Sequence, residues 1–163
     1  MTRLRETILS GDVQGTLLMP RQPNRLGVIV AAGSSGRVDV ARAKLFASRA
    51  AAALALRWFG GEGQPQGICE VPLETFTKAI DMLERHGCGR FAFVGTSKGA
   101  EAALLIAVRD PRLDTVVAIS PTSVVWCNTG PGLDGEVWPQ RSSWTHAGVA
   151  LPFIASDPYW KRC

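Results

Sequence analysis

Long hydrophobic runs are missing from this sequence. Its two most apolar stretches, Leu26–Ala32 and Ala50–Leu56, fall far short of the roughly 20 apolar residues that a membrane-spanning helix needs. The first residues, Met1 to Glu6, are not followed by a continuous apolar region, so we expect neither a secretory signal nor a membrane anchor. The sequence therefore predicts a protein with no membrane span.

Closely spaced cysteines are also missing. The four cysteines, Cys69, Cys88, Cys127 and Cys163, are scattered along the chain with no pair at metal-ligand spacing. This spacing argues against a zinc cluster and against a disulfide framework. We therefore predict no metal and no cofactor, and we expect the protein to reside in the reducing cytoplasm.

Clusters of one charge sign are absent as well. The net charge of +4 comes from 18 Lys and Arg against 14 Asp and Glu, spread along all 163 residues. A nucleic-acid surface would show local basic clusters interleaved with aromatic residues, so we expect no nucleic-acid partner. We interpret the positive balance first as a solvated surface, and the second alternative is that it helps to attract an anionic small-molecule substrate.

What the sequence does contain is an alternation of apolar strands and helical patterns. Leu26–Ala32 has the continuous apolar character of a strand buried in a parallel sheet. Val40–Ala50 has helical spacing with Asp39 as N-cap, and Ala51–Arg57 is again a buried strand. The alternation continues with a helix over Pro72–His86, a strand over Phe91–Val94, a helix buried nearly all round over Ala100–Val108 and a buried strand over Thr115–Ile119. This order predicts an α/β fold with a mostly parallel sheet and helices on both faces.

The composition and periodicity along the chain predict one partial domain over residues 1–163. Residues 1–25 hold short apolar pieces separated by glycine, which predicts a hairpin or edge strands. Residues 26–120 form the β-α-β core. Residues 121–163 are rich in proline and aromatic residues and show little periodicity, so we expect a cap over the site or a connection to strands that are missing.

The strand candidate before Ser97 and the helical pattern after it predict a nucleophile elbow. A serine at such a sharp turn needs small residues two positions away on either side, and Gly95 and Gly99 meet that need. The turn would lift the hydroxyl to the start of a helix, whose free amides favour developing negative charge. Ser97 is therefore the predicted catalytic nucleophile.

Two backbone amides are predicted to form the oxyanion hole. One belongs to Lys98, directly after the nucleophile, and the other to Ser34, in the Gly33–Gly36 loop after the first buried strand. The same strand-loop-helix order occurs in nucleotide-binding folds, but Val38 stands where a third glycine would be expected. Gly130–Gly135 also matches a dinucleotide fingerprint, but no strand precedes it, which favours a turn.

The histidine of a catalytic triad is not evident. His146 is the only histidine after Ser97, and Asp134 or Glu136 would have to be its acid. No strand end fixes the position of this imidazole, so an exposed loop histidine is the favoured interpretation. His86 stands at the end of a predicted helix, where a cation near the last carbonyls is structural.

Several segments together resemble the catalytic domain shared by acyl-CoA thioesterases and bile acid-CoA:amino acid N-acyltransferases. They cover most of the chain from Leu26 onward and comprise Val28–Asp39, Leu56–Gly61, Ile68–Phe76, Val94–Glu101 and Ser120–Trp126. The resemblance implies an α/β-hydrolase fold and cleavage or transfer of acyl groups from coenzyme A thioesters through an acyl-Ser97 intermediate. The acyl chain length and the acceptor, water or an amino acid, stay open.

The chain departs from that family at its carboxyl end. In the family the acid and the histidine follow the cap region, whereas this chain ends at Cys163, so we expect the last strands to be missing. The resemblance then implies that further sequence or a partner completes the fold. Two alternatives are an inactive remnant that acts as a binding module and a nucleotide-binding α/β module.

Overall fold

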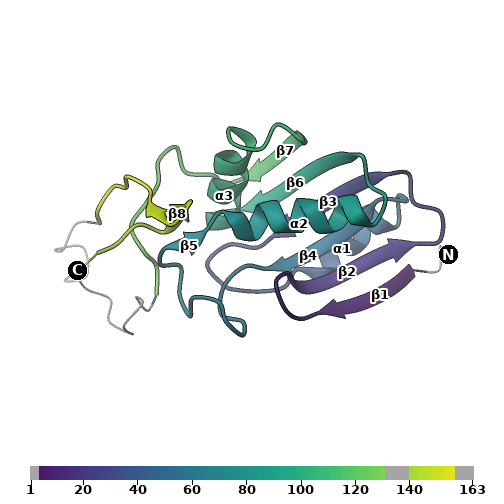
Figure 1. Cartoon of the computed structure of the whole chain (residues 1–163), viewed down its shortest axis with the longest axis horizontal. Coiled ribbons are helices and arrows are strands. Elements are labelled where there is room, and N and C mark those ends of the chain that lie inside the picture. The colour runs from purple at the N-terminus through teal and green to yellow at the C-terminus, as the bar shows by residue number, and fades with distance from the viewer. Residues whose placement is uncertain (1–3, 131–139, 157–163) are drawn as a thin grey trace.

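A six-stranded sheet with helices on both faces forms the body of the molecule (Figure 1). The computed structural model describes residues 4–130 and 140–156. In chain order, the elements are β1 (Leu4–Leu9), β2 (Gln14–Pro20), β3 (Leu26–Ala31), α1 (Val40–Ala47), β4 (Ala52–Arg57), β5 (Val71–Pro72), α2 (Glu74–Arg85), β6 (Arg90–Thr96), α3 (Lys98–Ala107), β7 (Leu113–Ile119), β8 (Trp144–His146) and β9 (Val149–Ala150).

The strand order of the large sheet is β1-β2-β4-β3-β6-β7. β1 and β2 pair antiparallel, which confirms the predicted hairpin, and β2 pairs antiparallel with β4. β4, β3, β6 and β7 are mutually parallel, so the prediction of a mostly parallel sheet is confirmed. Because carboxyl ends of parallel strands meet at one edge, β3 and β6 deliver the Gly33 loop and Ser97 to neighbouring positions.

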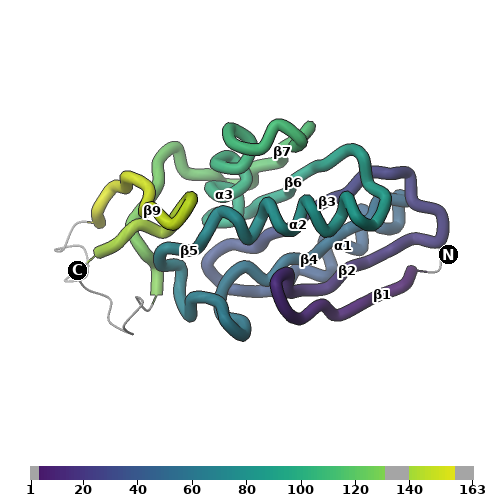
Figure 2. Tube along the Cα trace, viewed as in Figure 1, coloured from purple at the N-terminus to yellow at the C-terminus, as the bar shows by residue number. Residues whose placement is uncertain are grey.

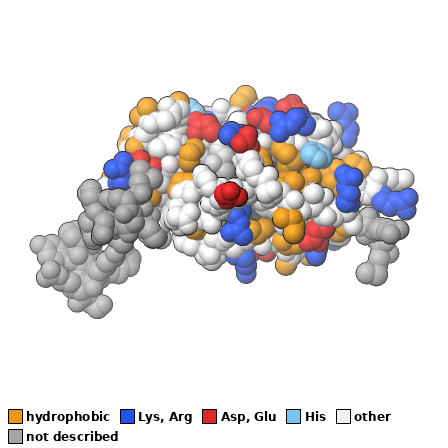
Figure 3. All heavy atoms as spheres, turned by 60° about the horizontal axis from the view of Figure 1, so that its bottom comes forward, with side chains coloured by type: hydrophobic (Ala, Val, Ile, Leu, Met, Phe, Trp, Pro, Cys, Tyr) orange, Lys and Arg blue, Asp and Glu red, His pale blue; other side chains and the backbone are white. Residues whose placement is uncertain are grey.

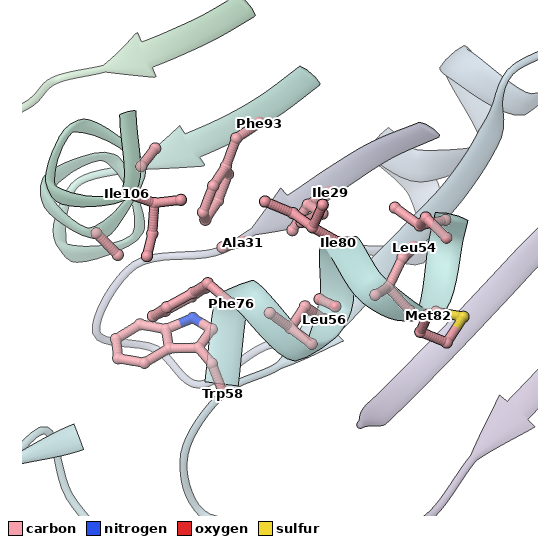
Figure 4. Close-up of a cluster of buried hydrophobic side chains, with 14 of the residues drawn as sticks. Ile29, Ala31, Leu54, Leu56, Trp58, Phe76, Ile80, Met82, Phe93 and Ile106 are labelled. Atoms are coloured by element: carbon pink, nitrogen blue, oxygen red, sulfur yellow. The ribbon is translucent and has the colours of Figure 1, made fainter. Parts of the chain in front are cut away.

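One helix, α1, covers one face of this sheet, and two helices, α2 and α3, cover the other. α1 packs Ala43 and Ala47 against β3 and β4 on one face. α2 and α3 cover the other face, where Phe76, Ile80 and Ile106 meet apolar side chains of β3, β4 and β6 (Figure 4). Burial of this apolar surface is the main term that holds the sheet and helices together.

The structure corrects two predictions of burial. α3 is buried along its first turns, but Leu104 and Val108 are 40% and 78% exposed, so this helix is not covered all round. The sequence predicts that β7 is a buried strand, yet Val117 is 45% exposed. Among the described residues, β7 is an edge strand with no neighbour beyond β6. Its apolar composition does not distinguish such an edge strand from a strand buried in the middle of the sheet.

The segment after β7 contains more regular structure than its composition suggested. β8 pairs parallel with β5 and antiparallel with β9 in a small three-stranded sheet. The trace in Figure 2 shows this part of the chain beside α3 and β5, at the end of the molecule away from the N-terminus. In the described ranges, no helix is long and apolar enough to cross a membrane.

A charged cluster ties α2 to the turn before β7 and predicts a pH dependence. Arg112 donates to both carboxylate oxygens of Asp110, at 2.9 and 2.7 Å, and also to Asp81 on α2 at 2.8 Å. The hydrogen bonds from Arg112 hold the pKa of the Asp110 carboxyl below its ordinary value of 3.8. The stabilisation that these hydrogen bonds add to the free energy of unfolding is therefore fully present at a pH above the ordinary pKa of Asp110. It is lost as the pH falls through the lowered pKa.

We expect Asp110→Asn to lower the free energy of unfolding at neutral pH by about 1.5–3 kcal/mol, the usual cost of losing a hydrogen bond to a charged group. The variant should also lose part of the acid sensitivity of the wild type. Urea unfolding at neutral and acidic pH measures both effects. Asp12→Asn, in the exposed turn of the hairpin, is the matched control, and equal acid sensitivity of all three proteins would contradict the prediction.

Candidate active site

Ser97 occupies the sharp turn between β6 and α3. Its backbone has φ 53° and ψ −117°, a strained conformation for a residue with a side chain. The turn is fixed because the Ser97 N–H donates to the Ile119 carbonyl at 2.9 Å, and its carbonyl accepts from Ala100 and Glu101 at 2.9 and 3.0 Å. The side chain of Ser97 is exposed at the carboxyl edge of the sheet, where the hydroxyl can meet a substrate.

The two elbow glycines lie where no side chain fits. A Cβ at Gly95 would overlap the carbonyl oxygen of Gly99, and a Cβ at Gly99 would lie 2.5 Å from the carbonyl oxygens of Ala31 and Ala32. These neighbours are backbone atoms of the helix and of the adjacent strand, so they cannot rotate away. The close approach allows the chain to double back directly at Ser97.

The loop after β3 lies against the elbow. A Cβ at Gly33 would lie 2.9 Å from the Cβ of Ser97, so the backbone of Gly33 contacts the candidate nucleophile. Gly36 donates to the Gly33 carbonyl at 3.3 Å and has φ 64°, which closes a tight turn around the exposed Ser34. α1 begins only at Val40, so the loop does not enter the helix directly as a dinucleotide-binding turn would.

Lys98 combines an amide at the helix start with a buried side chain. Lys98 is the first residue of α3, and the first amides of an α-helix have no acceptor within the helix. Its ammonium lies 3.1 Å from both carboxylate oxygens of Glu101, and both side chains are buried. Burial lowers the pKa of the Lys98 ammonium below its ordinary value, and the Glu101 carboxylate opposes that shift.

The Glu101 carboxylate also binds the segment that follows β7. It accepts from the Trp144 indole and from the Thr122 hydroxyl, each at 2.7 Å. The Lys98 ammonium in turn donates to the Ser143 hydroxyl at 2.9 Å. The helix that carries the elbow is thus joined to residues far along the chain. The one signal of this role in the sequence is a pair of opposite charges, Lys98 and Glu101, three residues apart in an otherwise apolar helix.

Aromatic side chains pack beneath the candidate site. The Trp58 indole donates to the Ala32 carbonyl at 3.1 Å, directly before the Gly33 loop. Trp58 also packs against Trp144 and Phe76, with ring centroids 5.3 and 6.0 Å apart, and Figure 4 shows it beside Phe76. Trp144 is fully buried, so it supports the core and does not line an open acyl pocket.

The structure does not join the histidines to Ser97. His146 is exposed at the end of β8, and no hydrogen bond links it to Ser97 within the described ranges. The nitrogen Nδ1 of His86 lies 2.8 Å from the Met82 carbonyl at the end of α2, as expected for a structural histidine. Asp134, Glu136 and most of Gly130–Gly135 lie outside the described residues.

The surface shows no gathering of one charge on the face drawn in Figure 3, where Lys and Arg alternate with Asp and Glu. A surface groove of about 660 Å³ is lined by Leu4, Arg5, Met19, Pro20, Arg21 and Pro23. These residues lie at the amino ends of the parallel strands, because Pro20 ends a strand antiparallel to β4. The groove is therefore remote from Ser97.

The fold belongs to the α/β hydrolases. The structure is similar to an esterase of Pyrococcus furiosus, with a TM-score of 0.58 and 16% identity over 74% of this chain and 50% of that chain. It is also similar to the thioesterase domain from the curacin biosynthetic pathway, with a TM-score of 0.50 and 20% identity over 73% of this chain and 45% of that one. The predicted fold class is therefore confirmed.

Sequence relatives narrow this class and confirm the resemblance to acyl-CoA thioesterases and N-acyltransferases. The chain is 34% identical over 129 residues to acyl-coenzyme A amino acid N-acyltransferase 2 of Rattus norvegicus. The matched residues cover 75% of this chain and 30% of the relative. It is 33% identical over 108 residues to acyl-coenzyme A thioesterase 1 of Homo sapiens, and these residues cover 63% of this chain and 25% of the relative. No family model matches the chain. The chain thus spans less than a third of the length of these relatives.

Proposed function

We propose that this chain carries the nucleophile and the oxyanion donors of a serine acyl hydrolase or acyltransferase that acts on acyl-CoA thioesters. The observation that carries the proposal is the strained, exposed Ser97 between β6 and α3, with the Gly33 loop against its Cβ. The named activities of its relatives supply the substrate class.

In the first step, the Ser97 oxygen attacks the carbonyl carbon of the thioester and loses its proton to a base. The bond between that carbon and the coenzyme A sulfur then breaks, and coenzyme A leaves as the thiol. The amides of Lys98 and Ser34 would stabilise the negative oxygen of the tetrahedral intermediate. Water or an amino acid then takes the acyl group from Ser97.

In the described ranges, no basic side chain forms a hydrogen bond with the Ser97 hydroxyl, so the general base is not identified there. Both histidines of this chain, His86 and His146, lie in the described ranges, so we propose that the activating histidine and its acid come from further sequence or from a partner. We propose, from the cysteine spacing, that the protein resides in the cytoplasm.

The proposal is tested by incubating the chain with a long-chain acyl-CoA and with a fluorophosphonate, with and without added imidazole as an external base. We expect an adduct of one acyl or phosphonyl group on Ser97, faster with imidazole, and release of one equivalent of free thiol from acyl-CoA. Intact-mass and peptide mass spectrometry measure the adduct.

Ser97→Ala should remove the adduct, whereas Ser10→Ala, which changes an exposed serine of the hairpin, should not. A rate that does not respond to imidazole would mean that the chain already holds its base. An adduct that persists in Ser97→Ala, or no adduct under any condition, would contradict the proposed function and would favour an inactive binding module.

A further inference from the structure

We propose that Arg42 is a positioning residue that holds the Gly33–Asp39 loop in place against the elbow. By doing so, it would set the spacing between the two oxyanion donors, the amides of Ser34 and Lys98. This inference rests on the proposed function. In this proposal, Arg42 does not contact the substrate and acts through its contacts with Thr96 and Asp39.

The loop is fixed to the elbow at its beginning by packing. The backbone of Gly33 lies against the Cβ of Ser97, and the space is too small for any side chain at Gly33. Beyond that contact, the loop runs through Ser34 and Ser35, both exposed, and through Gly36 at positive φ. Between its two ends, the loop is held only by packing, since the Phe59 ring lies near Gly36 and Val38 packs partly against the core on the α1 face of the sheet.

The loop is fixed at its end by Arg42. Asp39, the last loop residue, is buried and caps α1 by accepting from the Arg42 amide at 3.2 Å. From the first turn of α1, the Arg42 guanidinium reaches across and donates to the Thr96 hydroxyl at 2.5 Å. Its Nε also lies 3.6 Å from the Asp39 carboxylate. Thr96 is the residue directly before Ser97, so this bridge joins the end of the loop to the elbow.

The bridge suits this task because of its chemistry and burial. A guanidinium presents several donors in a rigid plane, so it can bind a carboxylate and a hydroxyl at the same time. The Arg42 side chain is 30% exposed and the Asp39 side chain 9% exposed, so the contact is partly shielded from water. The other charged partner of Asp39 is Arg37 at 3.1 Å, whose side chain is 67% exposed. Catalytic donors need such support, because a displacement of about 1 Å can cost up to about 100-fold in rate.

The test separates oxyanion stabilisation from the missing base by using a Ser97→Cys background. A thiolate needs no general base, so it can take the acyl group from acyl-CoA directly. The thiolate attacks the thioester carbonyl, the bond to coenzyme A breaks, and coenzyme A leaves as thiolate, with no net redox change. Iodoacetamide alkylates the same thiolate without forming an oxyanion. The ratio of the acylation rate to the alkylation rate therefore reports the oxyanion donors alone.

We expect Arg42→Ala to lower this ratio by about 10–100-fold while alkylation changes little. Arg42→Lys should recover part of the loss, because an ammonium can reach one partner but not both. Thr96→Val removes the acceptor hydroxyl at nearly constant shape and should lower the ratio in the same direction, and it serves as the test if Arg42→Ala does not fold. Lys44→Ala, on the same helix in an exposed ion pair with Glu6, should leave the ratio unchanged.

An unchanged ratio in folded Arg42→Ala or Thr96→Val would overturn the positioning role while leaving the proposed function intact. If the Ser97→Cys parent acylates no faster than a free cysteine derivative at the same thiolate concentration, the oxyanion hole itself fails, and the proposed function fails with it. The melting temperature of each variant shows whether a change in the ratio comes from unfolding.

Discussion

Replacing Glu101 by alanine is expected to lower the free energy of unfolding by about 3–5 kcal/mol, the usual cost of breaking a buried ion pair. The substitution leaves the Lys98 ammonium buried without its partner at 3.1 Å. It also removes the acceptor of the Trp144 indole and of the Thr122 hydroxyl. Because these contacts join α3 to the segment after β7, that segment should lose its attachment to the elbow helix.

Urea unfolding monitored by tryptophan fluorescence measures this effect, since the Trp144 indole donates directly to the carboxylate. Glu6→Ala is the matched control, because Glu6 forms an exposed ion pair with Lys44 at 3.2 Å. Exposed pairs contribute about 0–1 kcal/mol. If Glu101→Ala unfolds as the control does, the buried pair does not hold the segment.

The same site gives a pH dependence whose sign follows from Lys98. Burial holds the Lys98 pKa below its ordinary value of 10.5, so the folded protein binds fewer protons than the unfolded chain between the two pKa values. The free energy of unfolding contributed by this group therefore rises as the pH rises through the folded pKa. Glu101→Gln removes the charge that opposes the shift, so the rise should begin at a lower pH than in the wild type. Urea unfolding from neutral pH to the ordinary value checks this, and identical profiles would contradict it.

Gly95→Ala and Gly99→Ala are each expected to lower the free energy of unfolding by about 3 kcal/mol or more, the upper part of the range for overpacking. The new methyl group would overlap the Gly99 carbonyl oxygen in the first case and would lie 2.5 Å from those of Ala31 and Ala32 in the second. Relief would require separating α3 from β6 or β3, which would also displace Ser97. Natural domains have only about 5–15 kcal/mol to lose, so either change should lower the melting temperature strongly.

Gly89→Ala is the control for these substitutions. A methyl group there would lie 3.2 Å from Nη2 of Arg25, which is the flexible end of an exposed side chain and can move aside. Thermal unfolding followed by circular dichroism should therefore separate Gly89→Ala from both elbow variants. Equal melting temperatures for all three would show that the elbow tolerates side chains.

The elements of the core were predictable because each has a strong local pattern. The continuous apolar run at β3, the amphipathic helix α2 and the Asp39 cap all agree with the structure. The sequence predicts a helix as far as Ala50, whereas α1 ends at Ala47 and Ala50 has φ 66°. The exposure of Val117 on β7 was not predictable, because a strand at the edge of a sheet can have the same apolar sequence as one in its middle.

The candidate site divides in a similar way. Small residues on both sides of Ser97 are a local steric requirement, so the sequence by itself, with an apolar strand before them and a helical pattern after them, predicted the sharp turn at Ser97. Only the tertiary structure decided which distant groups support that elbow. Arg42 reaches Thr96 across 54 positions and Trp144 reaches Glu101 across 43, and such contacts leave no period or spacing in the sequence. They depend on how the sheet brings separate strands and helices to one edge, which is a property of the folded chain alone.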